Sequence, residues 1–319
     1  MTVSDAAPLE PVATAPEQLS AAAATRRERA VGITMMLGSS MSNQAGAAFG
    51  AIAFPMIGPV GVVAVRQFVT ALVLVPVARP RLSSLHRADW RLVLALAGVF
   101  SVMNVSLYAS VERIGLGLAV TLEFLGPLAV AIASSRRALD LGCAGLAAVG
   151  VVVLTDPGPT SDGVGVALAL VAAACWASYI LLNRALGQRL PGIRGTASAS
   201  LVSAVVWVPV AVVWFLAHPP SAAAVGLAIA CGLLSSAVPY VADLLALRRV
   251  PAQLFGTLTS LNPVWAAVAG WLLLHQALHV HEWVGVALIV TSSLVVSTRG
   301  LAALPRVRPG DVTAQQRRG

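Results

Sequence analysis

The chain has 319 residues, of which 58% are hydrophobic and only 11% are charged, and its mean hydropathy is +0.84. A soluble domain of this length needs more charged surface than this composition supplies, so a water-soluble globular protein is excluded. The net charge of +8 raises the alternative of a nucleic-acid-binding protein, which the positions of the charges then decide.

Ten apolar stretches of about 17 to 25 residues follow one another along the chain, and each is long enough to cross a bilayer. They lie at 30–54, 59–78, 90–110, 114–135, 139–155, 163–183, 196–216, 223–246, 253–274 and 281–299. The connections are short and carry turn residues, as in "FPMIGP", "TDPGPTSDG", "QRLPGIRG" and "AHPPS". The predicted fold class is therefore all-α, a polytopic membrane protein with ten transmembrane helices.

Basic residues test this topology independently, because the chain contains no lysine and all 21 basic residues are arginines. If both termini are cytoplasmic, Arg66 lies within a span and Arg113 lies in an outer loop, which leaves 19 of the 21 in cytoplasmic segments. Basic residues near membrane ends favour the cytoplasmic side. The segregation predicts a multi-pass protein of the cell (inner) membrane with both termini inside, and no nucleic acid as a partner. The polar segments 1–29 and 300–319 are expected to be disordered cytoplasmic tails.

An internal repeat relates the two halves of the chain. The stretch "VERIGLGLAVTLEFLGPLAVAI" at 111–132 aligns without a gap with "LRRVPAQLFGTLTSLNPVWAAV" at 247–268, and Pro127 falls opposite Pro263. The fourth span thus resembles the ninth, which divides the chain into five-helix repeats at 30–155 and 163–299. Because five is odd, the repeats have inverted orientations, a pattern typical of secondary transporters. A chance similarity between two apolar helices is the alternative.

The fourth span holds both a carboxylate, Glu123, and a helix-breaking residue, Pro127. Proline lacks the N–H that would bond the carbonyl four residues earlier, so Pro127 frees the carbonyl of Glu123, and Pro263 frees that of Thr259. Glu123 lies roughly 13 to 18 Å from either interface, a depth at which its charged form is disfavoured without a cation nearby. We expect Glu123 to bind a proton or an amine. A protonated carboxyl that hydrogen-bonds between helices is the alternative.

Three pairs of polar side chains within the spans each share a helix face: Asn104 with Tyr108, Tyr179 with Asn183, and Tyr240 with Asp243. Each pair can line a cavity or bond a neighbouring helix. Asp243 joins Glu123 as a candidate proton-coupling residue because it is ionisable. For Arg66, position alone favours an arginine that extends to the outer surface over a partner for a substrate carboxylate. The spacing of Gly46 and Gly50 predicts close helix packing within the chain.

The stretch "LAVTLEFLGPLAVAIASSRRALD" closely resembles the fourth-helix signature of the threonine and homoserine exporters, which belong to the EamA branch of the drug/metabolite transporter superfamily. The segments "NQAGAAFGAIAFPMIG", "VMNVSLYASV" and "ACWASYILLNRA" resemble the same family in the same order. The resemblance implies two EamA repeats, export of small amino acids and coupling to proton entry. It also implies a central cavity touched by Gln44, Arg66, Asn104, Tyr108, Glu123, Trp176, Tyr179 and Tyr240.

Two further positions in the second repeat, Thr259 and Asn262, are assigned to this cavity. Asn262 departs from the family, in which an acidic residue often precedes the proline of the ninth helix.

The leading hypothesis is a secondary transporter that exports threonine-like or homoserine-like amino acids by proton antiport with alternating access. Its expected partners are the lipid bilayer, a small-molecule substrate and protons. The sequence shows neither a catalytic constellation nor a metal-ligand set, so no enzyme activity, cofactor or metal is expected. One alternative is an efflux carrier for another amphiphilic metabolite or drug, because Trp176 and Tyr179 can stack on such a molecule. Another is a non-transporting membrane assembly factor whose polar groups only join helices.

Overall fold

The computed structural model of the chain describes residues 15–80, 82–133, 138–155, 162–190, 193–246, 249 and 258–299. Within these ranges the regular structure is entirely helical. The elements are α1 (Ala15–Ile52), α2 (Phe54–Ala78), η1 (Leu82–Ser84), α3 (Arg87–Ile114), α4 (Leu116–Glu123), α5 (Leu125–Ala133), α6 (Ala138–Thr155), α7 (Gly163–Gly187), α8 (Arg194–Ala217), α9 (Ala222–Gly232), η2 (Leu233–Ala237), α10 (Val238–Ala246), α12 (Asn262–Leu274) and α13 (Val280–Arg299).

Each of the ten predicted spans coincides with helical residues in the described part of the chain. Five helical segments there are long and apolar enough to cross a membrane: 54–78, 87–114, 116–133, 163–187 and 194–217. Shorter apolar helices occupy the predicted fifth, eighth, ninth and tenth spans, and α1 covers the first. The all-α, polytopic membrane fold is confirmed.

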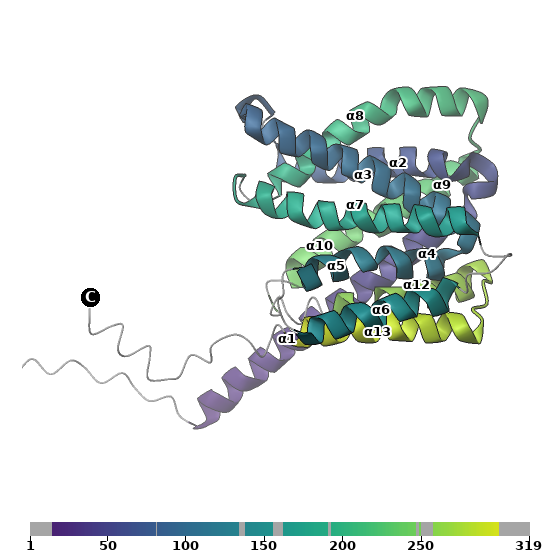
Figure 1. Ribbon diagram of the computed structural model, residues 1–319. Coiled ribbons are helices and arrows are strands. Elements are labelled where there is room, and N and C mark those ends of the chain that lie inside the picture. The colour runs from purple at the N-terminus through teal and green to yellow at the C-terminus, as the bar shows by residue number, and fades with distance from the viewer. Residues whose placement is uncertain are drawn as a thin grey trace, which may run out of the picture.

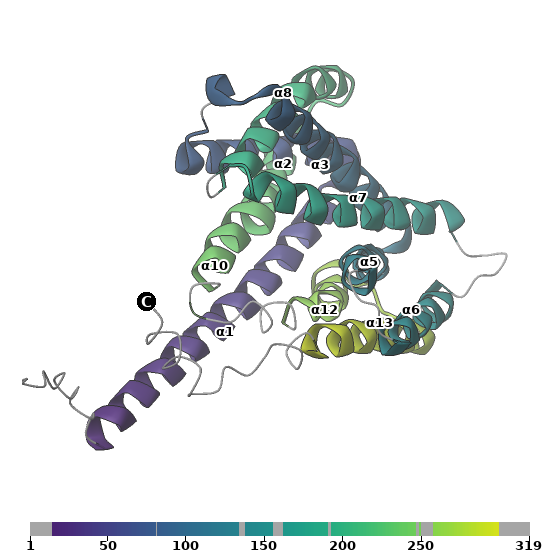
Figure 2. The ribbon, with the colours of Figure 1, turned by 60° about the vertical axis from the view of Figure 1, so that its left-hand side comes forward.

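The helices form a bundle in which specific pairs run side by side. Helix α3 packs along α7, α2 along α8, α6 along α13, and α1 along α10 (Figure 1). Figure 2 separates the α6–α13 pair from the group formed by α2, α3 and α8, with α5 and α12 between them. Helices α4 and α12 also pack together, near the centre of the bundle.

Two predicted boundaries differ from the structure. Helix α1 begins at Ala15, so the expected disorder of residues 15–29 is wrong. The alanine-rich stretch before the membrane has high helix propensity, and it continues the first span without a break. The predicted loop "FPMIGP" lies entirely inside α2, where the chain kinks at Gly58 with φ 67° and ψ 167°. A residue with a side chain is strained at this φ, so glycine permits the kink just before Pro59.

Gly46 and Gly50 allow the close helix packing that their spacing predicts, and their partners include the eighth span. A Cβ atom at Gly46 would collide with Ser235, and one at Gly50 would lie 2.8 Å from a ring carbon of Tyr108 and 3.0 Å from Cys231. These contacts lie within the chain, so the pair serves internal packing.

The eighth span contains a π-helical turn, η2, that the sequence analysis missed. Pro239 lacks the N–H that would bond the carbonyl of Ser235, and a wider turn accommodates this gap. Helix α1 holds the turn through two hydrogen bonds. Ser42 Oγ donates to the carbonyl of Leu234 at 2.9 Å, and Ser235 Oγ donates to the carbonyl of Asn43 at 3.0 Å.

Ion pairs mark the two ends of the bundle. At one end, Arg189 lies 3.6 Å from Asp89, next to the start of α3. At the other end, Arg113 lies 3.0 Å from Asp162, which also caps α7 by accepting a hydrogen bond from the Gly165 N–H at 2.8 Å. This hydrogen bond, together with the Arg113 guanidinium, holds the pKa of Asp162 below its ordinary value.

Candidate functional site

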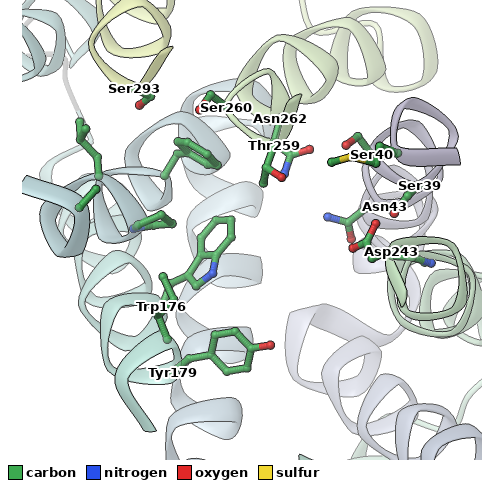
Figure 3. Close-up of a pocket in the computed structure, with 17 residues that line it drawn as sticks. Ser39, Ser40, Asn43, Trp176, Tyr179, Asp243, Thr259, Ser260, Asn262 and Ser293 are labelled. Atoms are coloured by element: carbon green, nitrogen blue, oxygen red, sulfur yellow. The ribbon is translucent and has the colours of Figure 1, made fainter. Parts of the chain in front are cut away.

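A cavity of about 490 Å³ lies between α1, α5, α7, α10, α12 and α13. Its polar lining comes from helices far apart in the sequence: Ser39, Ser40, Asn43, Tyr179, Asp243, Thr259, Ser260, Asn262 and Ser293. In Figure 3, Thr259 and Asn262 face Asn43 and Asp243 across the open space, and Trp176 and Tyr179 project from α7. The predicted cavity residues Trp176, Tyr179, Asp243, Thr259 and Asn262 therefore lie around one cavity.

A smaller chamber of about 120 Å³ adjoins this cavity and shares three wall residues with it: Asn43, Trp176 and Asn262. Its remaining polar lining consists of Gln44, Arg66, Asn104 and Glu123. A cation and a carboxylate from different helices thus line one space. We refer to the two spaces as the outer cavity and the inner chamber.

Glu123 is the last residue of α4, and its side chain is 6% exposed. The helix is interrupted at Phe124 and resumes as α5, in which Pro127 lies. In the predicted ninth span, helical structure is interrupted at Ser260 and Leu261, and α12 begins at Asn262, directly before Pro263. Each proline thus lies within a few residues of an interruption of the helix.

Arg66 is held in place by Tyr108. Its Nη1 atom donates to the Tyr108 hydroxyl at 2.9 Å, and the guanidinium carbon lies 5.4 Å from the centre of the Tyr108 ring. Tyr108 in turn approaches Cys231 Sγ at 3.0 Å and packs edge-on against Phe54. Arg66 therefore lines the inner chamber and does not extend to the membrane surface, against the interpretation from position alone. Tyr108, expected in the cavity, lies behind Arg66 and outside the walls of both spaces.

The polar residues of the two spaces are ordered by local contacts. Asn104 Nδ2 donates to the carbonyl of Phe100 at 2.7 Å. The side chain of Tyr179 lies near that of Asn183, as expected for a pair on one helix face, and the side chain of Asp243 lies near Ser39 of α1. The side chain of Tyr240 lies outside the described residues.

The bundle is closed at the end where Arg113 meets Asp162. Helix α4 touches α12 there, because a Cβ atom at Gly117 would lie 3.2 Å from the Cα atom of Ala267. Gln276, after α12, accepts a hydrogen bond from the Leu116 N–H at 3.0 Å and joins the same two helices. A separate hollow of about 320 Å³ lies outside this contact.

Comparisons with known proteins agree on the class of molecule. Residues 163–298 match the EamA-like transporter family. The chain is 37% identical over 294 residues to the threonine/homoserine exporter RhtA of Salmonella typhimurium (strain SL1344), covering 88% of this chain and 95% of the relative. RhtA of Escherichia coli (strain K12) is 37% identical over 276 residues, which cover 82% and 90% of the two chains. The chain belongs to the EamA-like transporter family.

A solved crystal structure shows the same fold. Its chain aligns with a TM-score of 0.56 at 18% identity, covering 88% of this EamA-like transporter and 99% of that chain. The family resemblance predicted from the sequence is confirmed, and the protein is a membrane transporter, not an enzyme. The transporter family also argues against the non-transporting assembly factor.

Sequence analysis missed several wall residues of this EamA-like transporter: Ser39, Ser40, Asn43, Ser260 and Ser293. Serine and asparagine are common inside membrane helices as interhelical hydrogen-bonding groups, so their presence alone does not mark a cavity. One signal was available on α1, where Ser39 and Asn43 are four residues apart and share a helix face.

Proposed function

We propose that this EamA-like transporter exports small amino acids of the threonine and homoserine type by proton antiport. The observation that carries the proposal is the inner chamber, whose wall contains Arg66 and Glu123 from different helices. An amino acid is a zwitterion with a carboxylate and an ammonium group, so the two side chains match its two charges. The names of the 37% identical relatives support the same substrate class.

In the proposed cycle, Glu123 binds either a proton or the substrate ammonium. The substrate carboxylate pairs with Arg66, whose remaining N–H groups can bind it after one has been given to Tyr108. Substrate binding displaces the proton from Glu123, and return of the proton releases the substrate on the other side. Asp243 is proposed to pass protons between Glu123 and the cytoplasm, because it lines the outer cavity that adjoins the inner chamber.

Alternating access is proposed to arise from two inverted repeats, with both termini in the cytoplasm. The helix breaks support this, because Phe124 and Ser260 occupy aligned positions of the fourth and ninth spans. Helix packing also supports it. The third span packs on the sixth, as α3 on α7, and the eighth packs on the first, as α10 on α1. In the proposed repeat, span three corresponds to span eight and span six corresponds to span one. The two helix pairs are therefore equivalent.

The second candidate substrate is another amphiphilic metabolite, favoured by the aromatic wall of the outer cavity. Trp176 lies there with its ring 5.5 Å from that of Phe124, and Tyr179 lies 5.5 Å from Phe100. These rings can stack on an aromatic or quaternary-amine solute.

The test uses purified protein in proteoliposomes with an imposed pH gradient and labelled threonine or homoserine. We expect the wild type to move both amino acids in the direction opposite to the movement of protons down their gradient. Glu123→Gln should lower gradient-driven flux at least about 10-fold, because the glutamine neither carries a proton nor pairs with an ammonium. The matched control is Glu112→Gln, an exposed carboxylate beside the hollow outside the closed end, which should transport like the wild type.

Three other outcomes are informative. If gradient-driven flux is retained in Glu123→Gln, the proton-coupling residue would be Asp243, or the protein would be an uncoupled carrier. A wild type that moves neither amino acid would overturn the substrate class. Flux of aromatic amines in place of amino acids would favour the second candidate.

A further inference from the structure

One buried acceptor in the site has no hydrogen-bond partner in the described part of the chain. The side-chain oxygen Oδ1 of Asn262 is buried and forms no hydrogen bond with any of the described residues, and the whole residue is 8% exposed. Buried polar atoms are nearly always hydrogen-bonded, because an unpaired one loses the hydrogen bonds that water would supply. An unpaired acceptor in the wall of a cavity is a place where a ligand can contribute a donor.

The position of Asn262 connects it with the charged groups. It is the first residue of α12, directly after the helix break, and it lines both the inner chamber and the outer cavity. Arg66 and Glu123 line the same inner chamber. Figure 3 shows the Asn262 side chain directed into the open space opposite Asn43. A small molecule bound between Arg66 and Glu123 would therefore share the inner chamber with Asn262, one of its wall residues.

A second buried atom of this kind is the hydroxyl oxygen of Ser293 on α13, which also has no partner among the described residues. Ser293 lines the outer cavity, whereas Asn262 lines both spaces. Of these two residues, Asn262 is the one that lines the inner chamber together with Arg66 and Glu123.

The identity of the missing donor follows from the proposed function, on which this inference rests. In the inner chamber the substrate ammonium faces Glu123 and its carboxylate faces Arg66. The substrate group left without a protein partner is its side chain, and a hydroxyl there is a donor that fits an amide oxygen.

We propose that Asn262 Oδ1 accepts a hydrogen bond from the side-chain hydroxyl of the substrate and thereby selects hydroxylated small amino acids over apolar ones of equal size. Valine is the decisive comparison, because it carries a methyl group where threonine carries the hydroxyl. Binding of valine leaves the Asn262 oxygen buried and unpaired. A site built around a substrate hydroxyl rejects an analogue that lacks it for this reason.

The experiment measures how unlabelled threonine, homoserine and valine compete with labelled threonine for counterflow into proteoliposomes without a pH gradient. For the wild type we expect valine to compete about 10-fold less well than threonine, the effect of one lost hydrogen bond to a buried acceptor. Asn262→Leu keeps the approximate size of the side chain and removes the acceptor. Threonine should then lose its advantage, while the competition by valine stays the same or improves.

Two further variants separate recognition from folding. Asn262→Asp retains an oxygen acceptor and should retain the preference for threonine. Ser200→Ala removes another buried hydroxyl without a partner among the described residues, on α8 and outside the walls of both spaces. This control should leave the ratio of threonine to valine competition unchanged.

Equal competition by threonine and valine in the wild type would overturn the inference without reference to any variant. A threonine preference that persists in Asn262→Leu would also overturn it, because the hydroxyl would then be recognised elsewhere. In both cases threonine is still transported, so the proposed function stands. A wild type that moves no amino acid would overturn the proposed function, and this inference with it.

Discussion

At the scale of single residues, the site depends on how a half-buried arginine, Arg66, is kept in position. Arg66 uses one N–H to bind the Tyr108 hydroxyl and lies against the face of the same ring. Tyr108 is fully enclosed, 1% exposed, and is held by Phe54 and Cys231. The guanidinium is therefore fixed on one side and offers its other donors to the inner chamber. A carboxylate in the chamber would compensate a charge that is costly to bury alone.

This arrangement predicts that lysine cannot replace Arg66. Arg66→Lys keeps the charge but loses the planar group that binds the Tyr108 hydroxyl, stacks on the ring and can bind a carboxylate with two hydrogen bonds. We expect the threonine concentration for half-maximal flux to rise about 10-fold or more. The measurement is the concentration dependence of threonine counterflow.

The matched control is Arg113→Lys, an exposed arginine that pairs with Asp162 at the closed end. Its half-saturating concentration should be that of the wild type. If Arg66→Lys also matched the wild type, Arg66 would serve only packing around Tyr108.

At the scale of elements, the transmembrane helices approach one another through glycine. Gly126 of α5 lies against the backbone of Ala173 in α7, so that a Cβ atom would collide with the Ala173 carbonyl. This contact brings α5 next to α7 just beside the break at Phe124, where Trp176 enters the cavity wall. Close backbone approach through small residues is a principal source of helix association in membranes.

Gly126→Ala should therefore destabilise the fold by about 1–3 kcal/mol, because the added methyl group forces α5 away from α7. The matched control is Gly142→Ala in α6, where a Cβ atom would meet nothing within 4 Å. Alanine there should be neutral or stabilising, since it favours the helix. Thermal unfolding in detergent measures both variants. Equal melting temperatures for the two would contradict the close contact at Gly126.

The helix breaks were predictable from sequence, whereas the π-helical turn was not. Pro127 and Pro263 lack an N–H in any environment, so the loss of a helical hydrogen bond near each of them follows from local chemistry. Pro239 has the same defect, but a π-helical turn stabilised by Ser42 and Ser235 accommodates it. That outcome depends on hydrogen bonds from α1, which sequence periodicity does not reveal.

The same distinction applies to the candidate site. Glu123 could be assigned to it from the cost of burying a carboxylate at that depth. The position of Arg66 could not, because a long side chain can either reach the interface or turn inward. Tyr108 decides the direction, and its contact with Arg66 forms between helices that the sequence does not place side by side.

At the scale of the whole molecule, the structure is closed at one end. Gly117 and Ala267 touch, and Gln276 joins α12 and α4, at the end that carries Arg113. The outer cavity lies on the other side of Glu123, beside α10 and the middle of α1. Under the proposed topology with cytoplasmic termini, this arrangement would be the conformation that takes up substrate from inside the cell. In the proposed alternating-access cycle, reversal of the contacts between the two proposed repeats would open the opposite end.

The central claim is that outward movement of one amino acid is obligatorily coupled to inward movement of protons. The most direct measurement loads proteoliposomes with threonine, applies no pH gradient and follows internal pH with a trapped indicator. The account predicts that the lumen acidifies as threonine leaves, and that Glu123→Gln abolishes the acidification. Threonine efflux without a pH change would indicate an uncoupled carrier, and alkalinisation would indicate symport. Either result would contradict the exchange of proton and substrate at Glu123.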